Sequence, residues 1–363
     1  MHEPQLKGLS PATKELVYPL LAWPEIQERR RGELDTVSRI RSIGDRVEAH
    51  AIPDLLSYAF APNRDVQVEA RSAIRRLFER SPLEQLPALD EALRTGWAHV
   101  EDWYGLKPSV EKVKGRDPDD FILLALMSSH RSGYVRAEVI HCLGKDSSEM
   151  AIPFLLVRLV DWVEPVRRAA DLELIDKLQP QYGSIFVQCL GLLERLSEQT
   201  RFRPAYREWV RELLKRPACA EQVTAGLESI QRAVRRACHP IAASNPALNV
   251  KSVLDRALVE SDVAIRRWAF ASGPTLWLGD EIDWTRRAAN DTYPPIRQVA
   301  FDSLARAEVS SEEISKLFSI DAQGYDAHVR HCAWSGLVSL RSRFIAKPWP
   351  AETAKERRLL FAV

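Results

Sequence analysis

The chain has 363 residues, 45% of them hydrophobic, which is enough for one large domain, two ordinary ones or a repeat array. Its 51 Lys and Arg residues nearly balance its 50 Asp and Glu residues, for a formal net charge of +1. This balance excludes a uniformly basic binder of nucleic acid or membrane surfaces and leaves room only for a local basic patch.

Cysteine usage and the N-terminus indicate a protein of a reducing compartment. The N-terminal residues show no basic start followed by an apolar run, and no stretch of about 18 uncharged apolar residues occurs. We therefore expect a cytoplasmic protein without a membrane segment. The cysteines are odd in number and form no C-x-x-C pair, which argues against a disulfide framework and predicts small buried apolar side chains: Cys142, Cys189, Cys219, Cys238 and Cys332.

One motif recurs along the chain: an aliphatic residue, usually followed by Arg, with a small residue four positions after the aliphatic one. Two upstream copies are assigned to Val37 and Val68, and degenerate copies fall near Val100 and Phe202. The clear copies advance in steps of 31, 68, 31, 31 and 33 residues: Val135, Val166, Val234, Ile265, Ile296 and Val329. This period predicts about ten stacked units of roughly 31 to 35 residues, from about position 15 to 343.

Each unit is predicted to be a helical hairpin. The segment AIPDLLSYAFAPNRDVQVEARSAI, from Ala51, opens with an apolar helical stripe and then turns through Pro62 and Asn63. The segment AIPFLLVRLVDWVEPVRRAADLELIDKL, residues 151–178, repeats that opening with a shorter turn. In it Pro153 and Pro165 suit first turns, because the missing N–H of proline costs nothing there.

These segments resemble HEAT repeats. The resemblance is carried by the run I-P-x-L-L, the turn with Asp and the motif V-R-x-x-A, and it is closest to the bilin-lyase-like HEAT subgroup. It covers most of the chain and implies an all-α fold, a right-handed α-solenoid of about ten HEAT-like hairpins whose second helices form a concave surface. Such arrays serve as scaffolds, adaptors, inhibitors and occasionally enzymes, so the fold alone does not give the function.

We expect a single array over residues 1–343 and a C-terminal tail or cap over 344–363. An exposed insertion is expected at about 106–120, because LKPSVEKVKGRDPDD is charged, contains two prolines and a glycine, and lacks apolar periodicity. Residues 242–249, AASNPALN, are expected to form a second loop. Neither segment is taken as a boundary between independent domains.

The arginines of the motif are interpreted as scaffold residues. In HEAT arrays the equivalent arginine bonds an acidic residue in the turn of its own or the next unit. Asp161, Glu260 and Asp291 each stand six residues before such an arginine, and a partly buried guanidinium must be paired. The arginines concerned are Arg136, Arg167, Arg235, Arg266, Arg297 and Arg330.

The candidate partner-binding residues lie two positions after the motif's aliphatic residue. A helical residue there is rotated about 200° from the core direction, so it faces solvent on the predicted concave side. Together with an aromatic residue near the C-terminal end, the set reads Arg168, Arg236, Arg267, Gln298, His331 and Trp334. The alternative is that these are solvated side chains neutralised by neighbours such as Asp171 and Asp302.

Aromatic residues and histidines give weaker signals. Trp268 is expected in the core, whereas Phe270 and Phe301, like Trp334, are expected to pack between units or to line the groove edge. Three histidines adjoin cysteines, but adjacent helical residues point about 100° apart and cannot chelate one ion. We therefore expect no metal site and no cofactor.

One enzyme class stays open. HEAT-like alkylpurine DNA glycosylases hold a Trp and a carboxylate in their cleft, and GWAHVEDWYG offers Trp97, Glu101, Asp102 and Trp103. Trp97 and Glu101 are one helical turn apart, so the pair could stack on a cationic base and stabilise positive charge at the sugar. The alternative is a degenerate hairpin with a core aromatic and a surface acid, and the near-neutral charge of the chain favours it.

The sequence thus favours a non-enzymatic scaffold that recognises a protein partner in its concave groove, as an adaptor, an immunity or inhibitor protein, or an assembly factor. Nucleic-acid binding is the alternative from another class. No catalytic residue is assigned, and the oligomeric state is left open.

Overall fold

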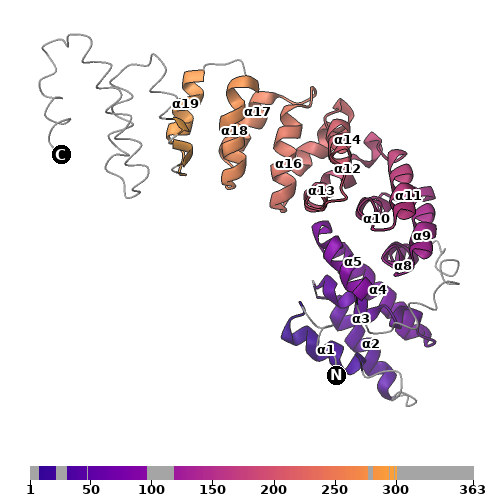
Figure 1. Ribbon diagram of the computed structural model, residues 1–363. Coiled ribbons are helices and arrows are strands. Elements are labelled where there is room, and N and C mark those ends of the chain that lie inside the picture. Colours follow the sequence, from indigo (N-terminus) through magenta and orange to yellow (C-terminus); the bar gives the residue numbers. More distant parts are fainter. Residues whose placement is uncertain are drawn as a thin grey trace, which may run out of the picture. The chain divides into compact units, whose positions relative to one another are not determined.

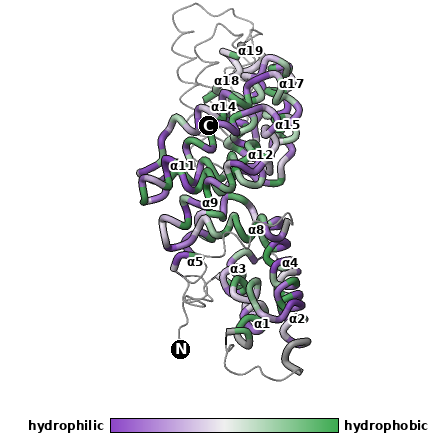
Figure 2. The backbone as a smooth tube through the Cα atoms, turned by 90° about the vertical axis from the view of Figure 1, so that its right-hand side faces the viewer, coloured by the Kyte–Doolittle hydropathy of each residue, from purple (hydrophilic) through white to green (hydrophobic). Residues whose placement is uncertain are grey.

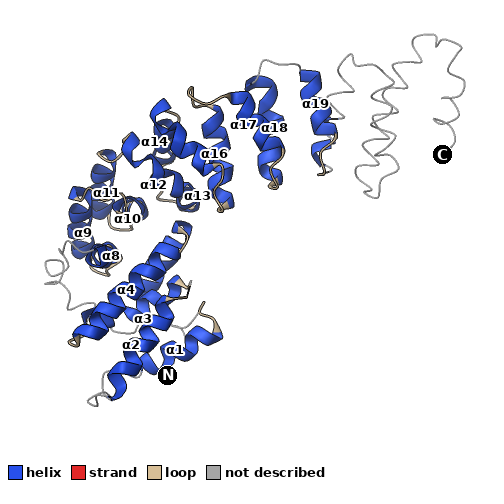
Figure 3. Cartoon of the chain, turned by 180° about the vertical axis from the view of Figure 1, so that it is seen from behind, coloured by secondary structure: helices blue, strands red, loops and turns tan. Residues whose placement is uncertain are grey.

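The computed structural model describes residues 8–21, 31–46, 48–95, 118–276, 281–293, 295–297 and 299–300. Within these residues the regular structure is helical throughout, with no strand (Figure 3). Most helices pair as antiparallel hairpins that follow one another along the chain, and this confirms the all-α solenoid expected from the repeat. The copies near Val100 and Val329 lie outside the described residues.

The chain divides into two compact units, Met1–Ile241 and Ala242–Val363. The division falls at the start of the predicted loop at 242–249. The expectation of one continuous array over residues 1–343 stays a prediction.

Unit 1 begins with two stacked hairpins. Helices α1 (Pro11–Leu21) and α2 (Arg31–Gly44) contact each other, and α2 packs along α4 (Arg64–Arg80). The first helix of the second hairpin is short: α3 (Ile52–Leu55) is followed by a 3₁₀ turn at Tyr58–Phe60. Gly44 allows the close approach of α2 and α4, because a Cβ there would lie 2.6 Å from the Cβ of Ala73.

The register of this second hairpin differs from the prediction. Asn63 caps α4 by accepting hydrogen bonds from the N–H groups of Asp65 and Val66, at 2.9 and 3.1 Å. Val66, three residues after the cap, is fully buried, whereas Val68 is 55% exposed. Val135 and Val166 also stand three residues after their N-caps, so Val66 and not Val68 is the repeat position.

Three layers of helix follow in unit 1. Helices α8 (Pro118–Met127) and α10 (Ala151–Arg158) are the first helices of two hairpins, and α9 (Gly133–Lys145) and α11 (Glu164–Ile175) are the second ones. Helix α5 (Leu86–Thr95) lies against α10 on the side opposite to α11 (Figure 1). Every residue of α10 is therefore buried. Of the expected insertion, 118–120 form the first turn of α8, and 106–117 lie outside the described residues.

The next two hairpins complete unit 1. Their first helices are α12 (Gly183–Gln188), continued after Cys189 by α13 (Leu190–Ser197), and α15 (Ala220–Gly226). Their second helices are α14 (Pro204–Leu214) and α16 (Arg232–Ala243), which reaches the boundary of the unit. In α14 the buried position three residues after the cap is Tyr206, so the degenerate copy near Phe202 carries an aromatic residue there. Hydrophobic and hydrophilic residues alternate along these helices (Figure 2).

Unit 2 contains α17 (Val250–Leu258), α18 (Val263–Leu276) and α19 (Glu281–Ala289). Its core cluster includes Leu254, Ile265 and Trp284, and Trp268 packs against this cluster while remaining partly exposed. Phe270 meets Trp284 of the next hairpin edge to face, at 6.1 Å between ring centroids. The expected packing between units is therefore present at Phe270, whereas Phe301 lies outside the described residues.

Candidate functional site

The repeat arginines hold the hairpins together, and of the two turn carboxylates that the sequence left open, Arg136 and Arg266 bind the one in the next unit. In five units the arginine donates from a terminal guanidinium nitrogen to the main-chain carbonyl six residues earlier, at 2.6 to 2.8 Å: Arg136, Arg167, Arg235, Arg266 and Arg297. The turn carboxylate belongs instead to the arginine of the preceding hairpin. Arg136 makes two hydrogen bonds to Asp161, and Arg266 makes two to Asp291.

Asp161 is the centre of the largest buried ion-pair cluster among the described residues. Besides Arg136, its carboxylate contacts Arg94 at 3.0 Å and Arg158 at 3.1 Å. Arg158 also pairs with Asp90. Burial raises the pKa of Asp161, but the hydrogen bonds of Arg136 and the charge of Arg158 outweigh it, so the pKa lies below its ordinary value. These interactions confirm that Arg136 is a scaffold residue, because its guanidinium is fully buried and paired with a carboxylate.

Three of the predicted partner-binding residues are exposed side chains of second helices. Arg168 lies on α11, Arg236 on α16 and Arg267 on α18. We call the exposed side of the second helices α9, α11, α14, α16 and α18 the second-helix face. Gln298, His331 and Trp334 lie outside the described residues, so their place on this face stays a prediction. Because Arg267 belongs to unit 2, the continuity of the line between the units also stays a prediction.

Arg168 lines a small pocket between α11 and the N-terminal end of α14. The pocket has a volume of about 130 Å³ and is rich in charge. Its lining residues are Leu159, Glu164, Arg167, Arg168, Asp171, Arg201, Arg203 and Tyr206. Four guanidinium groups thus face two carboxylates. We call it the arginine pocket.

The charges of the arginine pocket are only partly neutralised within it. Arg168 pairs with Glu164 at 2.9 Å, and Arg203 lies 3.6 Å from Asp171. Burial raises the pKa of Tyr206, and the nearby Asp171 raises it further while Arg203 opposes the change. Because four arginines outnumber two carboxylates, the pocket carries a net positive charge, and the phenol ring of Tyr206 lies beside these charges.

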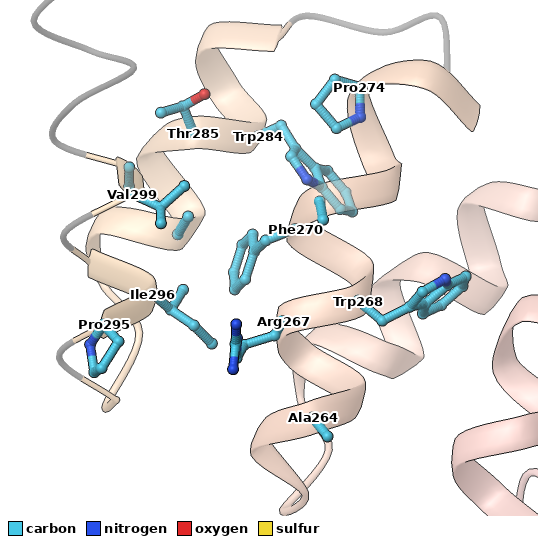
Figure 4. A pocket seen from close by; sticks show the side chains of 13 residues that line it. Ala264, Arg267, Trp268, Phe270, Pro274, Trp284, Thr285, Pro295, Ile296 and Val299 are labelled. Atoms are coloured by element: carbon cyan, nitrogen blue, oxygen red, sulfur yellow. The ribbon is translucent and has the colours of Figure 1, made fainter.

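Arg267 lines a second, more apolar pocket, which lies wholly within unit 2. Its volume is about 420 Å³, and aromatic side chains of α18 and α19 form much of its wall. Figure 4 shows Arg267 and Phe270 extending from α18 toward Ile296. Arg267 has no ion-pair partner among the described residues. We call it the aromatic pocket.

Sequence reasoning missed two groups of residues. The first consists of the exposed Arg201 and Arg203 and the buried Tyr206 of the arginine pocket, which the first-turn proline Pro204 could have placed at a helix start. The second is a set of apolar side chains in or beside the turns between paired helices: Tyr134, Trp162, Ile230, Val259 and Tyr293. Their common signal in the sequence is an apolar residue within a turn, a position that is normally exposed to water.

The described residues can also be searched for metal-binding clusters and membrane-spanning helices. Among the described residues no group of three or more His, Cys, Asp or Glu side chains is placed to hold a metal ion. Burial raises the pKa of the Cys238 thiol to about 12, and Cys189 and Cys219 are also buried while Cys142 is partly exposed. In the part of the chain that is described, no helix has the length and apolar character needed to cross a bilayer. Cys332 lies outside that part.

The residues of the glycosylase hypothesis, Trp97, Glu101, Asp102 and Trp103, lie outside the described residues. The glycosylase hypothesis therefore stays a prediction.

Comparison with known proteins does not place the chain in a family. No protein-family model matches it, and no curated protein does. Among solved structures it is similar to an engineered protein, at 12% identity over 93% of this chain and 97% of that chain, with a TM-score of 0.38. It is also similar to a chain of the Pds5–Scc1 complex, at 14% identity over 95% of this chain and 62% of that chain, with a TM-score of 0.31. At these scores the solenoid fold rests on the hairpins themselves, and the bilin-lyase-like subgroup stays a prediction.

Proposed function

We propose that the chain is a non-enzymatic helical-repeat scaffold that binds a protein partner on its second-helix face. The observation that carries this proposal is that two predicted contact residues, Arg168 and Arg267, each line a pocket on that face. Both pockets combine a guanidinium with an aromatic ring. Arginine and aromatic residues are the side chains that most often dominate the binding energy of protein interfaces.

The layering of unit 1 supports the choice of face. Helix α10 has α5 on one side and α11 on the other, and all of its residues are buried. A partner can therefore reach these hairpins from the side of α9 and α11 but not from the side covered by α5. Exposed apolar side chains occur on the accessible side, among them Leu172 and Ile175 of α11.

A protein partner fits this face better than nucleic acid does. Several arginines of the face stand beside acidic groups, as Arg168 does with Glu164 and Arg203 with Asp171. A phosphate backbone requires a continuous positive surface, because its affinity comes from neutralising successive charges. Mixed charge with exposed apolar side chains is instead typical of protein interfaces.

The test is affinity capture with matched charge-reversal variants. Immobilised protein is incubated with nuclease-treated extract of the native host, and bound proteins are identified by mass spectrometry. Replacing Arg168, Arg236 and Arg267 together by Glu should abolish capture of the proteins that the parent retains, with unchanged helicity by circular dichroism. The control replaces Arg64, Arg195 and Arg216 by Glu, which changes the net charge equally at exposed positions outside the second-helix face.

Two outcomes would contradict the proposal. Full capture by the Arg168, Arg236 and Arg267 variant would place the partner elsewhere, and residues 106–120 would be the next surface to test. Capture that occurs in a parallel extract without nuclease and disappears in the nuclease-treated extract would favour nucleic acid as the ligand. The adaptor, inhibitor and assembly-factor roles are then separated by the identity of the captured protein.

The glycosylase hypothesis has its own test. If Trp97 and Glu101 are structural, purified protein releases no alkylated base from DNA above background, and the Glu101→Gln variant behaves like the parent. Base release that the parent shows and the variant lacks would replace the scaffold by an enzyme.

A further inference from the structure

We propose that the arginine pocket is a carboxylate-binding subsite that receives an Asp or Glu side chain of an acidic protein partner. The inference rests on the proposed function, since it names the chemistry of the partner for the same face. The inference also goes beyond the proposed function, because it assigns a binding site to residues that no sequence motif marks, above all Arg201 and Arg203.

The first argument is the charge balance of the pocket. Its two carboxylates already have partners, because Glu164 pairs with Arg168 and Asp171 lies beside Arg203. Arg167 donates to the carbonyl of Asp161 and has no carboxylate partner among the described residues. Arg201 is exposed and makes no hydrogen bond or ion pair with any described residue. Two guanidinium groups in one pocket thus remain available to an anion.

The second argument is the backbone around the pocket. Its walls include the first turns of α11, which has 12 residues, and α14, which has 11. The N-cap residues are Val163 and Arg203, and neither caps its helix with a side-chain hydrogen bond. The positive ends of two helix dipoles therefore add to the charge of the four arginines. The first turn of α14 holds no acidic residue, whereas that of α11 holds Glu164, and Asp161 accepts a hydrogen bond from the N–H of Val163 at 2.9 Å.

The third argument is the size of the pocket and its surroundings. A volume of about 130 Å³ has room for a carboxylate group. Trp162 lies in the turn between Leu159 and Glu164, two lining residues, and is 63% exposed. On the neighbouring helices Leu172 follows Asp171, and Trp209 contacts the ring of Tyr206 edge to face, at 5.5 Å. A free anion would leave these apolar side chains in water, whereas a peptide that carries the carboxylate would cover them.

The test uses the full chain and two fluorescein-labelled peptides of equal length, ten glutamates and ten glutamines. Binding is followed by fluorescence anisotropy at low ionic strength. We expect the glutamate peptide to bind and the glutamine peptide not to bind. Raising the salt to 0.5 M should weaken binding at least tenfold, because exposed charges are screened over a shorter distance.

Variants assign the binding to the pocket. Arg201→Gln removes a side chain that makes no hydrogen bond or ion pair with a described residue, so we expect the fold to be retained. The affinity for the glutamate peptide should fall about tenfold or more. Arg64→Gln is the matched control, because Arg64 is also exposed and without an ion-pair partner among the described residues, but lies on α4. It should leave the affinity within twofold of the parent, and Arg201→Lys should recover part of the loss.

A second measurement identifies the anion. The protein is labelled with ¹⁵N-arginine, and the side-chain N–H signals are followed during titration with acetate, inorganic phosphate and chloride at constant ionic strength. Saturable shifts of the Arg201 and Arg203 signals with acetate, at lower concentration than with chloride, support the subsite. Saturation by phosphate at a tenfold lower concentration than acetate would overturn the carboxylate assignment.

The failures of the two proposals are distinguishable. Equal affinity of the glutamate peptide for the parent and Arg201→Gln would overturn the subsite and leave the scaffold proposal standing if protein capture persists. If Arg201→Gln loses binding of the glutamate peptide while the parent captures no protein, the result would instead support the anion site and contradict the scaffold proposal.

Discussion

Asp54 gives the sharpest prediction about stability, because it is a buried acid without a hydrogen-bond or ion-pair partner among the described residues. It lies on α3, is 2% exposed, and one of its carboxylate oxygens has no hydrogen bond. Burial raises the pKa of Asp54 from 3.8 to about 7. Its charge also contributes to the raised pKa of the neighbouring Tyr58, after the burial of that ring. Ionised Asp54 is therefore a destabilising group in the folded chain.

The sign and the size follow from proton linkage. A raised folded-state pKa means that the folded chain holds more protons than the unfolded chain between about pH 4 and 7. Stability from this group is thus present at low pH and lost as the pH rises toward the folded pKa. The difference between about 7 and 3.8 is roughly 3 pKa units, which corresponds to about 4 kcal/mol at 1.36 kcal/mol per unit.

The assay compares Asp54→Asn with the parent across pH. The amide does not ionise, so its stability relative to the parent should rise by about 4 kcal/mol between pH 4 and pH 8, most of it below pH 7. Hydrogen exchange of the α4 amides reports the stability of this hairpin directly, because α3 packs on α4. Glu79→Gln, at an exposed position of α4, should show no comparable change of stability with pH.

The amide itself can shift the absolute stability of the variant, since it is buried in place of the acid. That shift is the same at every pH and does not enter the slope. A stability difference between Asp54→Asn and the parent that is constant from pH 4 to pH 8 would refute the reasoning, because it would mean that the carboxyl ionises without cost.

Three further perturbations test the packing. Asp161→Ala should cost about 3 to 5 kcal/mol, measured by urea unfolding, because it leaves buried guanidinium groups without their anion; a loss below about 1 kcal/mol would contradict this. Val66→Asp should lower the thermal midpoint strongly and Val68→Asp hardly at all, and the reverse order would restore the sequence-based register. Gly273→Ala should loosen unit 2 by about 1 to 3 kcal/mol, seen in near-ultraviolet circular dichroism, because its Cβ would lie 2.1 Å from the ring of Trp284; an unchanged spectrum and midpoint would show that the ring yields freely.

Much of the fold could be predicted from the sequence, because hairpin signals are local. The period of apolar residues and the first-turn prolines give the helices of residues 151–178 nearly as the structure has them. The register at α4 could not be obtained this way, since Val66 and Val68 both fit an aliphatic position and the step of 31 from Val37 favours the wrong one. The cap at Asn63 decides it, and a cap is recognised by hydrogen bonds that a sequence pattern does not contain.

The candidate site was predictable only where it lies on one helix. The exposure of Arg168 follows from its angle to Val166, and the structure agrees. The arginine pocket needs a second wall from the next hairpin, and that hairpin replaces the aliphatic repeat residue with Tyr206. Because the repeat motif is not recognisable in this hairpin, the positions of Arg201 and Arg203 relative to Arg168 could not be obtained from the sequence.

The same geometry links partner binding to the stacking of hairpins. In a solenoid each hairpin is stabilised by its neighbours, and here the bonds that cross between hairpins include those from Arg136 to Asp161. The arginine pocket also lies across such a boundary, with Arg168 on α11 and Tyr206 on α14. A carboxylate bound there contacts both hairpins and binds the stacked state better than a separated one. On the proposal made above, mass action would stabilise the stacking of α11 against α14, and the proposed partner would act as an additional link between these two hairpins.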